Sequence, residues 1–273
     1  MKLSKNQLIT VLSFVVLAIG SYVFLPMVNK DKKPKPAAME STAKETPAFD
    51  FTAYLAKVKA SVTNTDTTKL IDQWENSNDY NALTLLFHEK GESVVEAYYT
   101  AKAGEIEKSK EKLERAGDLF EATSGISNSD DMKGYLLEKA VESYQNAYNL
   151  DSTNINLRMK YAGSLIEQGA SPMQGIAMLL DIVKKDPDNA DAQLMLGKFA
   201  MMSGQFEKAV QRLEKVISLR PQSNDALFLL AMAYENKGDK GKALEILQKC
   251  ESREKNPELK KEIGSYIERL KKS

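Results

Sequence analysis

Two consecutive stretches of 34 residues decide the fold: residues 187–220 read PDNADAQLMLGKFAMMSGQFEKAVQRLEKVISLR, and residues 221–254 read PQSNDALFLLAMAYENKGDKGKALEILQKCESRE. The same residue types return at the same places: Pro187 and Pro221, Gly197 and Ala231, Gly204 and Gly238, Ala209 and Ala243, Leu213 and Leu247, Val216 and Cys250. Each copy has the apolar spacing of two helices. Small residues let paired helices approach closely, and several pairs must stack to bury their apolar stripes.

Repeats of 34 residues with this pattern resemble the tetratricopeptide repeat (TPR) family, and residues 110–255 carry about four such copies. The two earlier copies begin near Leu113 and Ile155 and match less well. In the first copy the step from Phe120 to Ala140 is 20 residues, where the family has 9. About 11 extra residues are therefore predicted to form a loop near residues 123–133.

The flanking segments also have helical patterns. Residues 48–109 are predicted to form an N-terminal helical region. Residues 256–273 are predicted to form a capping helix, because the apolar residues Ile263, Ile267 and Leu270 lie on one side and charged residues cover the others. The predicted fold class is all-α: an N-terminal transmembrane helix, then an α-solenoid of TPR-like helix pairs with a C-terminal capping helix.

The N-terminal 47 residues have a different composition. A basic N-terminus, residues 1–7, precedes an uncharged run, residues 8–28, that would span roughly 31 Å as a helix. This run predicts a transmembrane anchor, and the alternative is a cleaved signal peptide. Residues 29–47 are rich in Lys and Pro and are predicted to form a linker.

We expect membrane contact through residues 8–28 and a single-pass location in the inner (cytoplasmic) membrane, with the C-terminal domain in the periplasm. The plan resembles membrane-anchored envelope proteins of bacteria that carry an exported TPR domain. The alternatives are a soluble exported protein, after signal cleavage, and an anchored receptor that faces the cytosol.

Composition and motifs argue against catalysis. The 38 Lys and Arg residues balance 38 Asp and Glu residues, so no overall field points to nucleic acid. One Cys and one His leave no Cys-based or His-based metal centre and no cofactor is implied. No hydrolase, phosphate-binding or zinc-protease motif is present. The single His88 is interpreted as a packing or capping residue, and we expect no enzymatic activity.

The TPR resemblance implies that the first helix of each repeat lines a concave groove. By register, the predicted groove residues are Met159, Ile166, Asp191, Leu194, Lys198, Met201, Met202, Asp225, Phe228, Met232 and Glu235. Methionine side chains adapt to irregular partners, so this mixture favours a protein or peptide partner. The alternative is that these methionines pack against the second helices or the cap.

These observations predict a membrane-anchored TPR adaptor or scaffold that binds a protein or peptide partner in its groove. A role in envelope protein assembly or secretion is expected from the resemblance. The alternative is a self-associating assembly protein, a homo-oligomer whose helices mediate the contact.

Overall fold

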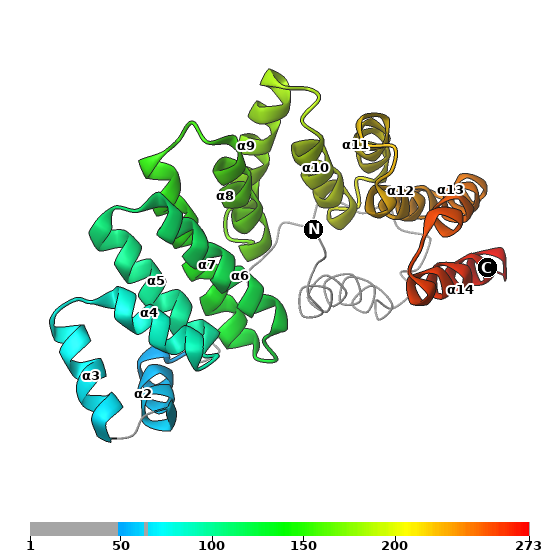
Figure 1. The fold of residues 1–273 in the computed structure, drawn as a ribbon. Helices are drawn as coiled ribbons and strands as arrows, with labels where there is room; N and C mark the ends of the chain where they lie inside the picture. Colours follow the sequence, from blue (N-terminus) through cyan, green and yellow to red (C-terminus); the bar gives the residue numbers. More distant parts are fainter. Residues whose placement is uncertain (1–48, 63–64, 273) are drawn as a thin grey trace, which may run out of the picture.

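The computed structural model describes residues 49–62 and 65–272, and this part contains thirteen α-helices and no strand. The helices form a curved arch, with α2 and α3 at one end and α14 at the other (Figure 1). The helices are α2 (Phe51–Val62), α3 (Thr65–Asn76), α4 (Tyr80–Glu89), α5 (Ser93–Glu107), α6 (Lys110–Ile126), α7 (Asp130–Leu150), α8 (Ile155–Gln168), α9 (Pro172–Lys185), α10 (Ala190–Met202), α11 (Phe206–Leu219), α12 (Asn224–Lys237), α13 (Lys240–Arg253) and α14 (Pro257–Lys272).

Consecutive helices pack in pairs that stack along the arch. The pairs α6–α7, α8–α9, α10–α11 and α12–α13 lie in the region where the sequence predicts four repeats, and each pair also contacts the next. α4 and α5 form a further pair, joined by residues 90–92, and α5 packs directly on α6. The prediction of an all-α, TPR-like solenoid is confirmed for the described residues.

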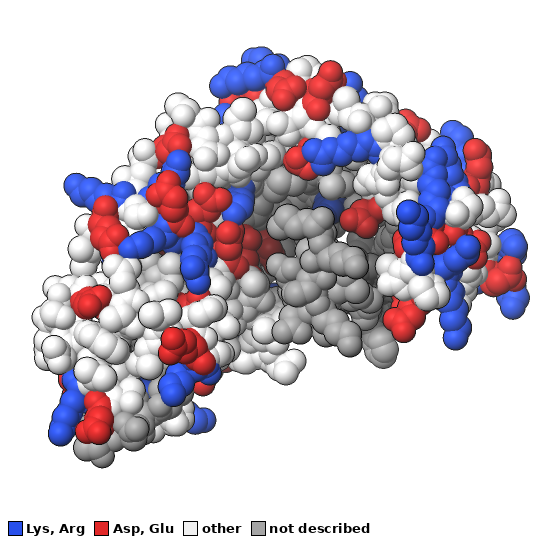
Figure 2. All heavy atoms as spheres, viewed as in Figure 1, with Lys and Arg blue, Asp and Glu red and all other residues white. Residues whose placement is uncertain are grey.

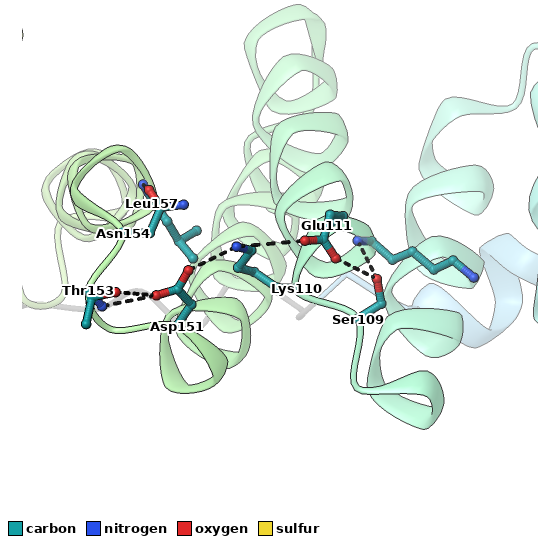
Figure 3. A network of polar contacts seen from close by, with 8 residues as sticks. Ser109, Lys110, Glu111, Asp151, Thr153, Asn154 and Leu157 are labelled. Carbon is teal, nitrogen blue, oxygen red and sulfur yellow. Dashed lines mark hydrogen bonds and ion pairs between the residues drawn. The ribbon is translucent and has the colours of Figure 1, made fainter.

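The joints between pairs share one capping position. Asn154, Asn189 and Ser223 each precede the first helix of a pair, and each side chain accepts a hydrogen bond from a backbone N–H three residues further on, at 3.0–3.3 Å. Such caps satisfy one of the free N–H groups at a helix start. At the joint before α8, Asp151 also pairs with Lys110 at 2.9 Å (Figure 3). This ion pair ties the joint to the start of α6.

The predicted loop at residues 123–133 is wrong. α6 continues to Ile126 and α7 begins at Asp130, so three residues connect the two helices. Ser129 caps α7, and Asp130 and Asp131 lie in its first turn, where carboxylates interact favourably with the helix dipole. The extra residues therefore lengthen α6 and α7 to 17 and 21 residues, against 13 or 14 in the later pairs.

The core is a series of local clusters that follow the arch. Phe87 and Tyr99 are central to the cluster of α2 to α5, and Tyr144 to the cluster of α5 to α8. Leu179 and Leu247 hold the same places in the clusters of α8 to α10 and α10 to α14. All five side chains are at most 1% exposed. Each pair thus buries its apolar stripe against its neighbours.

The last helix, α14, packs on the end of the arch through one apolar seam. Ile263, Ile267 and Leu270 of α14 are buried in the same cluster as Leu247 and Cys250 of α13. The predicted apolar seam of the capping helix is therefore confirmed. Cys250, which stands at the repeat position of Val216, fills the core as a small apolar side chain.

Close approach within a pair is clearest between α8 and α9. A Cβ atom added at Gly175 would lie 2.3 Å from the backbone carbonyl oxygen of Ala162. Gly117 plays a similar part in α6, where an added Cβ would lie 2.6 Å from the ring of Tyr144. At these two positions only glycine leaves room for the partner helix.

Replacing Gly175 with Ala should therefore lower the free energy of unfolding by about 2–3 kcal/mol, because the backbones must move apart. Gly134 provides the matched control, since nothing lies within 4 Å of a Cβ added there. Gly134→Ala should raise the free energy of unfolding by about 0.5–1 kcal/mol through helix propensity. Urea unfolding measures both values, and equal effects would contradict the close packing.

The expected location in the inner membrane is not supported, and we correct it. In the ranges 49–62 and 65–272, no helix combines the length and the apolar composition needed to cross a bilayer. The physical reason is that these helices, of 10 to 21 residues, carry charged side chains on their exposed faces. The predicted anchor, residues 8–28, and the segments 1–7 and 29–47 lie outside the described residues.

Candidate functional site

The first helices of four successive pairs carry equivalent positions along the arch. We call these positions the groove face: Glu114, Asp118 and Glu121 on α6; Met159, Gly163 and Ile166 on α8; Leu194, Lys198, Met201 and Met202 on α10; and Phe228, Met232 and Glu235 on α12. The α6 residues stand 45 positions before their α8 equivalents, which is one repeat plus the residues that lengthen α6 and α7. The TPR resemblance predicts that this face lies on the concave side.

The predicted groove residues differ widely in exposure. Met159 and Met201 are buried, Ile166, Leu194, Phe228, Met232 and Glu235 are half-buried, and Asp191, Lys198, Met202 and Asp225 are exposed. Met159 belongs to the α8–α10 cluster and Met201 to the α10–α14 cluster, so the two side chains lie in separate cores. Of the predicted apolar groove residues, Met202 is the one whose side chain is exposed, at 67%.

The structure brings the α10 and α12 residues together on one core. Leu194, Phe228 and Met232 pack against the cluster of α10 to α14. The Phe228 ring lies edge-on to the ring of Tyr266 on α14, with centroids 5.7 Å apart, and the Tyr266 hydroxyl donates to Glu235. α14 therefore contacts the α12 part of the groove face and leaves those side chains half-covered.

The α6 end of the groove face is acidic. Lys160 of α8 bridges Glu114 at 2.8 Å and Asp118 at 2.7 Å. The buried hydroxyl of Tyr144 donates to Asp118 at 2.8 Å and to Glu121 at 3.1 Å. Lys160 thus pairs with two carboxylates, and the Tyr144 hydroxyl links the third, Glu121, to Asp118. These contacts tie α6, α7 and α8 together at this point.

Glu121 has the most perturbed carboxyl group of this face. Burial raises its pKa to about 7, and the negative charges of Glu167 on α8 and Asp118 act in the same direction. The hydrogen bond from Tyr144 opposes this shift. A cationic group placed beside Glu121 would lower this pKa again, so the position favours a positive ligand group.

Charge on the rest of the groove face is sparse. Asp191, a predicted groove residue in the first turn of α10, pairs with Arg220 at 2.6 Å, and this hydrogen bond holds the pKa of Asp191 below its usual range. Lys198 is exposed and makes no ion pair with any residue in the described part of the chain. On the face that Figure 2 shows, Lys and Arg are interspersed with Asp and Glu over the arch. The face therefore runs from acidic at α6 to largely apolar at α10 and α12.

The described residues include no group of three or more His, Cys, Asp or Glu side chains that could hold a metal ion. Cys250 is buried, and burial raises the pKa of its thiol to about 11, which disfavours the thiolate. His88 is not a packing residue, because its ring is largely exposed and its Nδ1 lies 3.0 Å from Glu96.

Sequence reasoning missed the acidic α6 positions, although extending the register by 45 residues finds them.

Comparisons with known proteins agree with this architecture. A family model described as tetratricopeptide repeat matches residues 174–217 and 200–261. The chain is 28% identical over 108 residues to a peroxisomal targeting signal receptor of Pichia angusta. The aligned residues make up 40% of this chain and 18% of the receptor. The chain therefore spans less than a fifth of the length of this relative.

Two solved structures share the fold. PilW, a widely conserved type IV pilus biogenesis factor, is 20% identical with a TM-score of 0.54, over 71% of this chain and 85% of PilW. MamA from Desulfovibrio magneticus RS-1, from residue 41 to its end, is 19% identical with a TM-score of 0.51, over 66% of this chain and 96% of that one. The chain carries tetratricopeptide repeats and has the solenoid fold of TPR proteins.

Replacing Glu121 with Gln tests the electrostatics of the α6 end. The folded protein binds the Glu121 proton more tightly than the unfolded chain does, so its stability should fall as the pH rises from about 4.5 to about 7. Glu121→Gln removes this loss and should raise the free energy of unfolding by about 1–3 kcal/mol at pH 8. The gain should vanish near pH 4, where both states are protonated.

Urea unfolding over this pH range measures the effect. Glu138→Gln is the control, since Glu138 is exposed on the adjacent helix α7 and its replacement should change stability by less than about 0.5 kcal/mol. A gain at Glu121 that is independent of pH would contradict the shifted pKa.

Proposed function

We propose that this chain is a non-enzymatic TPR scaffold that binds an extended segment of a partner protein along the groove face. The observation that carries the proposal is the exposure of Met202 at the C-terminal end of α10, next to the buried Met201. A flexible thioether on a face whose other apolar members are buried or half-buried offers a partner an adaptable contact. Burying such a side chain contributes about 1.5–3 kcal/mol before ordering costs.

The charge pattern favours a partner segment that is basic at one end and apolar at the other. Basic residues of the segment would lie over the acidic α6 positions, near Glu121 and Asp118, and apolar residues over α10 and α12. Lys198 carries the one unpaired positive charge of the α10 part of the face. A cation near Lys198 would be repelled, so this position favours a neutral or acidic residue of the segment.

The absence of enzymatic activity belongs to the same proposal. It is supported by the lack of catalytic motifs in the sequence and by the repeat architecture. A role in envelope protein assembly or secretion stays a prediction from the sequence, because PilW resembles this chain in fold alone. Self-association stays the alternative function, and the experiment below separates the two.

A photo-crosslinking residue, p-benzoylphenylalanine, in place of Met202 should yield a discrete adduct with a partner in cells that express the full chain. The same residue in place of Met173 is the matched control. Met173 is 72% exposed but lies on α9, the second helix of its pair, which does not carry the groove face. Immunoblotting after irradiation measures the adducts. We expect an adduct at position 202 and none at 173.

Two results would count against the proposal. Equal adducts at both positions, or an adduct at position 173 alone, would move the contact off the groove face. An adduct at position 202 with the mass of two copies of this chain would favour self-association.

A further inference from the structure

A cleft of about 280 Å³ opens between α4, α5 and α6. One face of α4 forms its first wall, through Thr84, Leu85 and His88. Ala103 of α5 and Arg115 of α6 also line the cleft. Among the described residues that line the cleft, none is Asp or Glu, whereas α6 contributes two basic side chains.

One end of the cleft holds the Arg115 and His88 side chains above a buried carboxylate. The Glu96 side chain is 5% exposed and receives Arg115 Nη2 at 2.7 Å and His88 Nδ1 at 3.0 Å. The Arg115 and His88 side chains are themselves mostly exposed. A guanidinium group has five N–H donors in a planar fork, and the bond to Glu96 leaves others for a second acceptor. Glu96 therefore fixes the two side chains at the rim.

The other end of the cleft is closed by a tight polar contact. Lys112 Nζ donates to Asn81 Oδ1 at 2.7 Å and to Glu107 Oε2 at 2.5 Å. Asn81 Nδ2 in turn donates to the second oxygen of Glu107 at 2.7 Å. These contacts use two of the three N–H donors of Lys112 and one of the two of Asn81. The bond to Glu96 uses one of the five N–H donors of Arg115, so most free donors of the cleft lie at the Arg115 end.

Between the two ends lie an unpartnered hydroxyl and an exposed apolar side chain. The Thr84 Oγ1 atom is buried and has no hydrogen-bond partner among the described residues. A buried polar group without a partner destabilises a fold, so an acceptor that enters the cleft would be favoured. Leu85 is 58% exposed beside it and offers an apolar contact.

We propose that this cleft binds a carboxylate group that lies next to an apolar side chain of a partner. The carboxylate accepts hydrogen bonds from Arg115 and from the Thr84 hydroxyl, and the apolar side chain packs on Leu85 and Ala103. The volume suits one or two side chains rather than a larger ligand. The carboxylate can come from a chain terminus or from Asp or Glu. The site shares no residue with the groove face, so its failure leaves the groove proposal standing.

Methyl NMR of the full chain, labelled at Leu and Ala, tests the proposal. Leu85 and Ala103 report on the cleft, and Leu219 reports on a distant helix. The probes are N-acetyl-leucine, the blocked dipeptide N-acetyl-Leu-Asp-amide, and N-acetyl-leucinamide, which has no carboxylate. We expect a carboxylate probe to shift the Leu85 and Ala103 methyls and to bind about tenfold more tightly than leucinamide. The tighter of the two carboxylate probes identifies the source.

Thr84→Val is the sharpest variant, because it removes a hydroxyl that makes no hydrogen bond to the described residues. It should weaken binding of the carboxylate probe about three- to tenfold while the methyl spectrum elsewhere stays unchanged. Arg115→Gln should weaken binding by at least about tenfold, and Arg220→Gln, which replaces an exposed arginine that also pairs with a carboxylate, should not.

Three results would overturn the proposal. Equal affinity for leucinamide would remove the carboxylate from the interaction. Unchanged binding in Thr84→Val and Arg115→Gln would place it elsewhere, as would shifts confined to methyls outside the cleft. If Arg115→Gln does not fold, Thr84→Val alone decides, because it tests the same carboxylate contact.

Discussion

The structure depends on the close approach of the two backbones within each helix pair. Gly175 lies directly over the carbonyl of Ala162, and Ala209 and Ala243 are fully buried at the equivalent places of the next two pairs. Larger side chains there would separate the helices and tilt each pair on its neighbour. Since each core cluster is shared by consecutive pairs, such a change would propagate along the arch.

Much of this fold follows from spacing in the sequence. The small residues recur every 34 residues in the last two copies, and this spacing predicts the pairs α10–α11 and α12–α13. The loop prediction failed because an insertion can lengthen helices as well as form a loop. Residues 118–126 contain no proline, and Ser129 caps α7 late, so both helices continue. The capping residue sets where α7 begins, which the spacing of the apolar residues does not show.

The candidate sites were harder to predict for a physical reason. A repeat register assigns a position to a face, but it does not say how far a neighbouring helix covers it. Met201 and Met202 are adjacent in sequence, yet one is buried in the core and the other is exposed. The α4–α6 cleft depends on how α6 packs against α4 and α5, two helices that lie before the predicted repeats, so only the structure reveals it.

Methionine oxidation measured by mass spectrometry tests the central claim most directly, because the rate of sulfoxide formation follows exposure. In the free chain, Met202 and Met173 should react quickly and Met159 and Met201 slowly. With the partner bound, the account predicts that Met202 becomes protected and that Met173 does not. Unchanged oxidation of Met202, or protection of Met173 instead, would contradict a binding surface on the first helices.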